Sequence, residues 1–569
     1  MKLPLYFLLL FSLVLAGEGL SAAPALDTWR NLKAPVNVSF ASSDVRYAQD
    51  LVPEVARQNQ WQATAWKGEK VHTQLLVWAN REIPRLQVSL SDLKDGKGNR
   101  IASKNITAGF VRYVMTDEFG QGCGYRKPTD YDSSLVADPI DTAAVTAVAA
   151  NTVQPLWLSI AVPRNTPAGK YRGVVTVHAG KPYKLRVAVT VQERELPPPG
   201  EWAFDLDLWQ HPAAVARVHG VPLWSQAHYD AMRPYYTMLA SAGQKNITAS
   251  IIDEPWNHQT YDDFPSLVKW IKRKDGTWAY DYSRFDAYVS FVMSCGIKQR
   301  INCYTMVPWE MAFPYFDEAT GQEVVFSAKA GTPEYNAFWG NMLQDFARHL
   351  KQKGWFSITS IAMDERPLAD MQAVIKLLKE TDPDWKIALA GIYHPEIEPD
   401  IFDYSIASKW KFGEKVLEER KASGKPSTFY TSCEEALPNG FTFSPPAEHA
   451  WIGWYAAAQG FTGYLRWAYN SWVENPLLDS RFRTWPAGDT YQVYPGPLTS
   501  IRFEKLVEGI QDFEKIRLLR EEFARTGNHA KLQELNKTLA AFEVEKLNEM
   551  PAAEAVGKAK ALLNQLQEK

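Results

Sequence analysis

The chain has 569 residues, which is too long for a single hydrophobic core and is a natural size for two or three domains. Its 62 Lys and Arg residues nearly balance its 65 Asp and Glu residues, which gives a net charge of −3. Because nucleic-acid and membrane-surface partners usually require a basic excess, this balance argues against both, and a neutral ligand fits better.

The first residues follow the pattern of a secretory signal. Lys2 precedes an apolar run over residues 5–15, and small residues follow near the expected cleavage site at residues 21–25. We therefore expect residues 1–24 to be a signal peptide and the mature chain to be exported, to the periplasm or the extracellular space. No later segment has the roughly 18 to 20 uninterrupted apolar residues that a bilayer crossing needs, so we expect no membrane anchor in the mature chain.

Residues 25–196 alternate short β-type runs with turn residues and show no long helical period. The runs are VHTQLLVWAN, RLQVSLSDL, TAGFVRYVM, QPLWLSIAVP and GKYRGVVTVHAGKPYKLRVAVTVQ. Short strands at regular spacing, with Pro and Gly between them, predict an antiparallel β-sandwich. The stretch ERELPPPGEW is a stiff proline linker that ends this domain near Pro197.

Residues 197–526 alternate short apolar runs with longer amphipathic stretches. Eight short runs occur, at residues 203–209, 246–252, 299–306, 358–363, 386–392, 403–408, 427–432 and 463–469. Helix-patterned stretches lie between most of them, and several end in Gly, as helix C-termini do. Eight β/α units predict a (β/α)8 TIM-type barrel, with a doubly wound open sheet as the alternative. Residues 527–569 are expected to form a C-terminal helical segment.

The four cysteines show no pattern that predicts cross-links or metal binding. Cys123, Cys295, Cys303 and Cys433 form neither a disulfide framework nor a CxxC pair, so we expect buried free thiols. The aromatic residues are more informative, because 21 Trp, 25 Tyr and 26 Phe make up 13% of the chain. Aromatic faces stack on the C–H faces of sugar rings, so this content suggests a sugar ligand.

Polar and aromatic residues gather where the predicted barrel strands end, at the edge that carries the sites of such barrels. They are Asp207, Trp209, His211, Asp253, Glu254, Tyr304, Asp364, Glu365, Tyr393, His394, Trp410, Tyr430, Glu434, Glu435, Trp467 and Tyr469. Carboxylates and aromatics at a barrel mouth suggest glycoside hydrolysis, which needs a protonated acid and a group that stabilises an oxocarbenium-like centre. We expect Asp207, on the first strand, to contact the sugar.

Glu365, in the stretch SIAMDERP, is the predicted acid. A common two-carboxylate retaining mechanism would use Glu434 or Glu435 as the nucleophile. Against this mechanism, the residue before the acid is Asp364, an acceptor that suits the N–H of a 2-acetamido sugar. The acetamido oxygen would then attack the anomeric carbon and form an oxazolinium ion, while Asp364 holds the N–H and offsets the positive charge.

The residues alone leave two further questions open. A second acidic pair, Asp253–Glu254, differs little in pattern from the first, but acids of barrel glycosidases usually lie on strand four. A glycan-binding protein without catalysis also fits the aromatic mouth of the barrel. For the substrate, Tyr430 or Tyr393 is expected on the acetamido oxygen, and Trp467 or Trp472 beside the N-acetyl methyl group.

The stretch SIAMDERP, with GYLRWAYNSWVENPLLDSRFRTWPAGDTYQVYPGP and TSIRFEKLVEGIQDFEKI, resembles glycoside hydrolase family 123, the retaining β-N-acetylgalactosaminidases. The resemblance runs from the sandwich to the terminal helices, and the long loop after strand eight is its specific part. It implies a β-sandwich followed by a (β/α)8 barrel, with no metal and no other cofactor. It also implies substrate-assisted hydrolysis of a glycan with terminal β-linked N-acetylgalactosamine.

The resemblance further implies which residues form the site. The family's adjacent Asp and Glu correspond to Asp364, which orients the acetamido group, and Glu365, the general acid and base. Sugar-contacting groups are expected in the long loop at Trp467, Tyr469, Trp472, Asp479, Arg481 and Trp485. Asp479 would take the 4- and 6-hydroxyls, whereas Arg481 and Arg483 either contact the sugar or only brace the loop as ion pairs.

Overall fold

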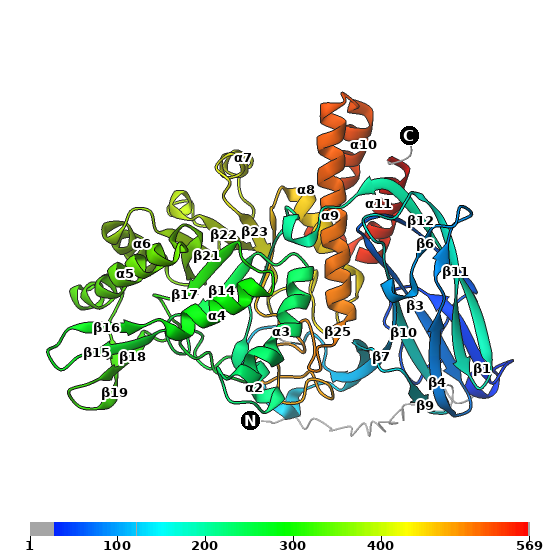
Figure 1. Cartoon of the computed structure of the whole chain (residues 1–569), viewed down its shortest axis with the longest axis horizontal. Coiled ribbons are helices and arrows are strands. Elements are labelled where there is room, and N and C mark those ends of the chain that lie inside the picture. Colours follow the sequence, from blue (N-terminus) through cyan, green and yellow to red (C-terminus); the bar gives the residue numbers. More distant parts are fainter. Residues whose placement is uncertain (1–27, 121, 567–569) are drawn as a thin grey trace, which may run out of the picture.

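The computed structural model describes residues 28–120 and 122–566. An N-terminal β-sandwich and a parallel barrel lie side by side, with helix α9 (Ile501–Arg525) between them (Figure 1). The predicted signal peptide, residues 1–24, lies outside the described residues. Within the described part of the chain, no helix is long and apolar enough to cross a membrane.

Two sheets form the N-terminal domain. One has the strand order β1-β3-β10-β7-β8-β25, and the other has the order β2-β12-β11-β4-β9 with the short strands β5 and β6 beside it. The sandwich is antiparallel as predicted, except that β2 and β12 pair in parallel. These strands are β1 (Val36–Ala41), β2 (Gln60–Lys67), β3 (Lys70–Ala79), β4 (Ile83–Leu90), β5 (Leu93–Lys94), β6 (Arg100–Ile101), β7 (Ile106–Thr116), β8 (Ser134–Asp141), β9 (Thr146–Val148), β10 (Thr152–Ala161), β11 (Gly169–Ala179), β12 (Pro182–Glu195) and β25 (Thr499–Ser500).

Strand β3 shows why the sandwich forms from these residues. Side chains alternate between the two faces of a strand, and here both faces are buried. Leu75 and Val77 lie in the core between the two sheets, whereas Leu76 and Trp78 pack in a separate cluster on the other face, with Trp29. The strand is therefore apolar along most of its second half.

The second domain is a nearly closed barrel of eight parallel strands, and each strand lies within one of the eight predicted runs. The strand order is β13-β24-β23-β22-β21-β20-β17-β14. Between the two end strands, one isolated bridge joins Leu206 of β13 to Gln244, which lies just before β14. The strands are β13 (Asp205–Leu208), β14 (Asn246–Ser250), β17 (Arg300–Tyr304), β20 (Thr359–Met363), β21 (Lys386–Gly391), β22 (Asp403–Ala407), β23 (Ser427–Tyr430) and β24 (Gly463–Arg466).

Helices connect the barrel strands, and their ends follow the sequence signals. Gly354 and Gly460 end two of them in the left-handed conformation, with φ of 73° and 78°, which a residue with a Cβ adopts only with strain. The helices are α2 (Pro212–His219), α3 (Gln226–Ser241), α4 (Ser283–Ser294), α5 (Pro333–Lys353), α6 (Leu368–Thr381), α7 (Glu414–Ala422) and α8 (Ala447–Gln459), followed by α9 and the C-terminal helices α10 (His529–Leu539) and α11 (Ala552–Leu566).

The loops after β14 and β17 contain a small extra sheet that is not predicted from the sequence. Its order is β16-β15-β18-β19. The strands are β15 (Lys269–Lys272), β16 (Trp278–Asp281), β18 (Ala312–Asp317) and β19 (Gln322–Ser327). Much of the surface of these short strands is at least partly exposed. Their sequences therefore lack the apolar runs by which strands are predicted.

Helix α9 fastens the two domains together. Ser500 caps its N-terminus and also belongs to β25, which pairs with β8 of the sandwich. Arg502 Nε donates to Asp138 Oδ2 at 2.8 Å, and both side chains are fully buried. Lys515 pairs with Glu69 of the sandwich. Separating the domains would leave these buried charges without their partners, which is costly. The two contacts therefore hold the sandwich beside the barrel.

Candidate active site

A cavity of about 250 Å³ opens at the C-terminal ends of the barrel strands. We call it the main cavity. Its wall carries both predicted catalytic carboxylates, Asp364 and Glu365, which directly follow β20. Most of the other large side chains in the wall are aromatic: Trp209, Trp256, Trp309, Tyr430, Trp467 and Trp485. The main cavity thus combines adjacent carboxylates with the flat apolar surfaces that sugars stack on.

Asp364 is held in place by two indoles. Its Oδ2 accepts hydrogen bonds from Trp256 Nε1 and Trp309 Nε1, both at 3.0 Å. Its Oδ1 is buried without a hydrogen-bond partner among the described residues, and Arg366 Nε lies 3.6 Å away. Burial raises the pKa of Asp364 to about 6, while the Arg366 charge and the indole hydrogen bonds act to lower it. One carboxylate oxygen is therefore fixed, and the other is an unsatisfied acceptor.

Neither of these indoles is predicted from the sequence as a site residue. Trp256 lies in the loop after β14 and Trp309 in the loop after β17, beyond the strand tips. The Arg366 guanidinium stacks over the Trp309 ring at 3.8 Å from its centroid. A sequence signal does exist, because each Trp follows a proline shortly after a barrel strand, in DEPW and VPWE.

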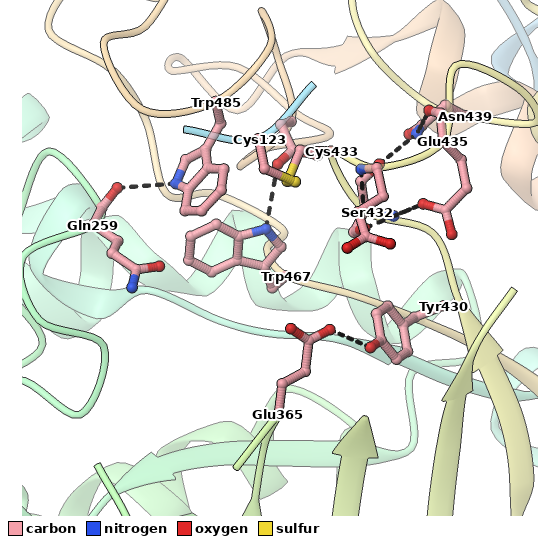
Figure 2. Close-up of a disulfide and its surroundings, with 12 residues drawn as sticks. Cys123, Gln259, Glu365, Tyr430, Ser432, Cys433, Glu435, Asn439, Trp467 and Trp485 are labelled. Atoms are coloured by element: carbon pink, nitrogen blue, oxygen red, sulfur yellow. Dashed lines mark hydrogen bonds between the residues drawn. A yellow bond between two sulfur atoms is a disulfide. The ribbon is translucent and has the colours of Figure 1, made fainter. Parts of the chain in front are cut away.

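Glu365 is exposed at the rim of the main cavity. Its Oε1 accepts a hydrogen bond from the hydroxyl of Tyr430, the last residue of β23 (Figure 2). Tyr430 thus lies in the wall of the main cavity and contacts the predicted acid. Its predicted contact with a substrate acetamido oxygen stays a prediction.

The rival carboxylates have other partners. Glu435 accepts hydrogen bonds from Ser408 Oγ at 2.5 Å and from the Ser432 backbone N–H at 2.8 Å, so it fixes its own loop. Glu434 lines the main cavity but pairs with Lys409 in an exposed ion pair. A carboxylate that already holds loop N–H and O–H donors is a poor nucleophile, which disfavours Glu435 in that role.

The second acidic pair, Asp253–Glu254, does not line the main cavity. Asp253 accepts from the Ser266 N–H at 2.7 Å, and Glu254 accepts from the Phe264 N–H at 2.7 Å. Both carboxylates line a separate cavity beside the extra sheet. Their hydrogen bonds organise the loop after β14.

Trp467 and Trp485, two of the predicted sugar-contacting residues, form one side of the main cavity (Figure 2). Their rings meet edge to face, with centroids 5.1 Å apart. Trp485 Nε1 donates to the Gln259 carbonyl oxygen at 3.0 Å, and Trp467 Nε1 donates to Asp489 Oδ2 at 3.3 Å. These hydrogen bonds fix the orientation of both rings toward the cavity.

Three predicted aromatic contacts lie outside the wall of the main cavity. Tyr469 and Trp472 are fully buried, and their polar groups donate to the backbone oxygens of Tyr235 and Val493. The Tyr393 ring packs edge to face on Phe412, with centroids 5.2 Å apart. Tyr469 and Trp472 therefore pack in the core, whereas Tyr393 is partly exposed, because strand-tip position alone does not determine which way a loop side chain turns.

Two predicted acidic contacts also lie elsewhere. Asp207 is buried within the barrel, where its Oδ2 accepts from Asn246 Nδ2 at 2.7 Å. Asp479 pairs with Arg481, whose Nη1 donates to Ser133 Oγ of the sandwich at 2.7 Å. Of the two roles considered for Arg481, the structure therefore favours bracing of the loop against the sandwich.

The prediction of four free thiols is wrong for two cysteines. Cys123 and Cys433 form a disulfide, with their Cα atoms 4.9 Å apart (Figure 2). Cys295 and Cys303 are free and buried, as predicted. The pair is separated by 310 residues, so no spacing pattern reveals it. Both disulfide cysteines line the main cavity, which means that the sandwich contributes part of the cavity wall through its β7–β8 connection.

Reduction of this disulfide is expected to lower the melting temperature. A cross-link over so long a segment restricts the unfolded chain, and its loss typically costs about 2–4 kcal/mol. Thermal unfolding with and without dithiothreitol measures the effect. The Cys123→Ser variant is the control, because the reductant should not lower its melting temperature further. Equal wild-type melting temperatures in both conditions would contradict the prediction.

Comparisons with known proteins agree on one family, glycoside hydrolase family 123. The family model Glycoside hydrolase 123, catalytic domain, matches residues 209–519, and the model Glycoside hydrolase 123 N-terminal domain matches residues 40–179. A solved family 123 glycoside hydrolase from Clostridium perfringens, described for glycolipid glycan hydrolysis, is 26% identical, with a TM-score of 0.85 over 94% of this chain and 98% of that chain.

Other solved structures are more distant. A family 39 glycoside hydrolase from Bacteroides cellulosilyticus WH2 is 12% identical over 79% of this chain and 82% of that chain. Its TM-score is 0.33. No curated protein matches the chain.

Proposed function

The chain belongs to glycoside hydrolase family 123, and from this membership we propose that it is a retaining exo-glycosidase that releases terminal β-linked N-acetylgalactosamine from glycans. The observation that carries the proposal is the contrast between two adjacent carboxylates in the main cavity. Asp364 has one oxygen fixed by indoles and one without a partner, while Glu365 is exposed. A 2-acetamido sugar needs both, because its N–H requires an acceptor and its glycosidic oxygen requires a proton.

In the proposed first step, the sugar supplies the nucleophile. Ionised Asp364 accepts the acetamido N–H, and the acetamido oxygen attacks the anomeric carbon. As that bond forms, the bond from the anomeric carbon to the glycosidic oxygen breaks, and Glu365 donates its proton to the departing oxygen. The positive charge of the oxazolinium ion is offset by the Asp364 carboxylate.

In the second step, water opens the oxazolinium ring. Glu365, now ionised, takes a proton from the water as the water oxygen attacks the anomeric carbon. The bond to the acetamido oxygen breaks and the β configuration is restored. Two inversions at the anomeric carbon give overall retention. The hydrogen bond from the Tyr430 hydroxyl holds Glu365 in position.

We also propose that the mature chain is exported. The pattern of residues 1–24 supports this, and so does the Cys123–Cys433 disulfide, because disulfides persist in oxidising compartments. The C. perfringens relative acts on glycolipid glycans. A glycolipid glycan that ends in N-acetylgalactosamine is therefore a suitable first natural substrate to test.

An aryl glycoside assay tests the proposed function. The mature chain should hydrolyse para-nitrophenyl β-N-acetylgalactosaminide, and an N-acetylgalactosamine thiazoline, which mimics the oxazolinium ion, should inhibit it. A conventional two-carboxylate enzyme would turn over the substrate and resist the thiazoline. A glycan-binding protein without catalysis would give no turnover.

The pKa of Asp364 sets the expected acid limb of the pH profile. Because burial raises this pKa to about 6 and the mechanism needs the ionised carboxylate, kcat/KM should fall below about pH 6. Trp309→Phe removes one hydrogen-bond donor from the carboxylate, so the limb should move to higher pH. Trp410→Phe, an exposed tryptophan outside the main cavity wall, is the control. An unmoved limb in Trp309→Phe would count against this role of Asp364.

A further inference from the structure

A second cavity, of about 150 Å³, adjoins the main cavity. Four residues line both cavities: Asp364, Glu365, Ser432 and Glu434. The predicted acid therefore stands at the boundary between two hollows. A general acid must lie within hydrogen-bond reach of the glycosidic oxygen, the atom that joins the released sugar to the rest of the glycan. The two sugars lie on either side of this oxygen, so both need space next to the Glu365 carboxyl group.

The linings of the two cavities differ. The main cavity reaches inward to residues on or just after strands, such as Trp209 and Leu465, and its aromatic walls suit a terminal ring with its N-acetyl group. The second cavity is lined by buried residues such as Met371 and Leu389 and by Ile392, His394 and Lys409 from the loops after β21 and β22. Ile392 is 40% exposed, so this side faces solvent, where the rest of a glycan has room.

Building on the function proposed above, we propose that the second cavity binds the sugar from which N-acetylgalactosamine is released, with Lys409 and His394 as its polar contacts. The ligand class is a neutral sugar ring that bears several hydroxyl groups. The donors suit hydroxyl oxygens, and Ile392 offers an apolar surface to the C–H face of the ring.

Lys409 is available for such a contact. Its ammonium pairs with Glu434, but the two side chains are 55% and 57% exposed, and exposed ion pairs contribute little to stability. A sugar hydroxyl can insert beside the pair or replace one partner at small cost. Arg366, by contrast, is stacked on Trp309 and only 11% exposed, so it serves as a fixed wall.

His394 is fixed at its backbone. Its N–H donates to the Tyr404 hydroxyl at 2.9 Å, and the same hydroxyl donates to the Ile392 carbonyl oxygen at 2.8 Å. The loop after β21 is thereby held on the barrel, and His394 lines the second cavity. A ring on a fixed backbone loses less freedom when it binds a ligand than one on a loose loop.

Substrate selectivity tests the proposal. Lys409→Ala and His394→Ala should lower kcat/KM more for a disaccharide of N-acetylgalactosamine β-linked to galactose than for the para-nitrophenyl glycoside, by a further factor of about ten, the effect of one lost hydrogen bond. Lys411→Ala is the matched control, because Lys411 pairs with Glu543 and lies outside both cavities. It should leave both substrates unaffected. Equal losses on both substrates, or no loss on the disaccharide, would overturn the proposal.

A binding measurement separates this proposal from the proposed function. Calorimetric titration of Asp364→Asn with the disaccharide and with methyl β-N-acetylgalactosaminide needs no turnover. Adding Lys409→Ala should weaken binding of the disaccharide by about tenfold more than that of the methyl glycoside. Equal weakening would overturn the second-cavity proposal even in an active enzyme. If the wild type cleaves neither substrate, the proposed function fails, and this titration alone decides what the second cavity binds.

Discussion

Replacement of Asp364 by Asn is expected to lower kcat on an aryl β-N-acetylgalactosaminide by about 100-fold or more. A preorganised electrostatic contact to a charge that develops in the transition state contributes roughly 3 kcal/mol. The amide keeps an oxygen for the two indole donors but loses the negative charge that offsets the oxazolinium ion. Steady-state kinetics on the purified variant measure the loss. The matched control is Asp253→Asn, because Asp253 lines a separate cavity.

A stability measurement tests whether misfolding causes that loss. The pKa of Asp364 is raised from 3.8 to about 6 in the folded chain, so its contribution to stability is full below pH 3.8 and is lost as the pH rises through 6. The Asn variant does not carry this cost. Its melting temperature at neutral pH should therefore equal or exceed that of the wild type. Retained activity in Asp364→Asn, with loss in Asp253→Asn, would move the site to the Asp253–Glu254 pair.

Glu365→Gln is expected to cost about 10²- to 10⁴-fold in kcat/KM on a natural glycan, the usual contribution of a positioned general acid. The loss should shrink for aryl glycosides, because a good leaving group departs without a proton. Kinetics across leaving groups of decreasing pKa measure this trend. An equal loss on every substrate would argue against an acid role. Glu435→Gln, which alters a carboxylate that fixes its own loop, serves as the control.

The barrel could be predicted from the sequence for a clear physical reason. Parallel strands buried on both faces form short continuous apolar runs, and helices between them repeat at a longer period. Each of the eight strands accordingly lies within a run, from β13 (Asp205–Leu208) to β24 (Gly463–Arg466). The extra sheet was not accessible, because its partly exposed strands lack such runs.

Residues of the candidate site could be predicted only where they lie close to strand ends or in the long loop after strand eight. Tyr430 ends β23, and Asp364 directly follows β20, so strand direction places both at the barrel mouth. Trp256 and Trp309 lie farther along loops whose paths depend on tertiary packing. Tertiary packing also decides that Tyr469 and Trp472 turn into the core, so the sequence did not reveal their orientation. It likewise brings Cys123 and Cys433 together from two different domains.

In the proposed mechanism, the acetamido group of the substrate is the nucleophile, and Asp364 holds it. A series of aryl glycosides with one, two and three fluorine atoms on the N-acetyl methyl group tests it most directly, because each fluorine makes the acetamido oxygen a weaker nucleophile. We predict that kcat/KM falls steeply with each added fluorine in the wild type and that Asp364→Asn loses most of its remaining activity on the same series. Equal kcat/KM values across the series would contradict the claim and point to an enzyme nucleophile.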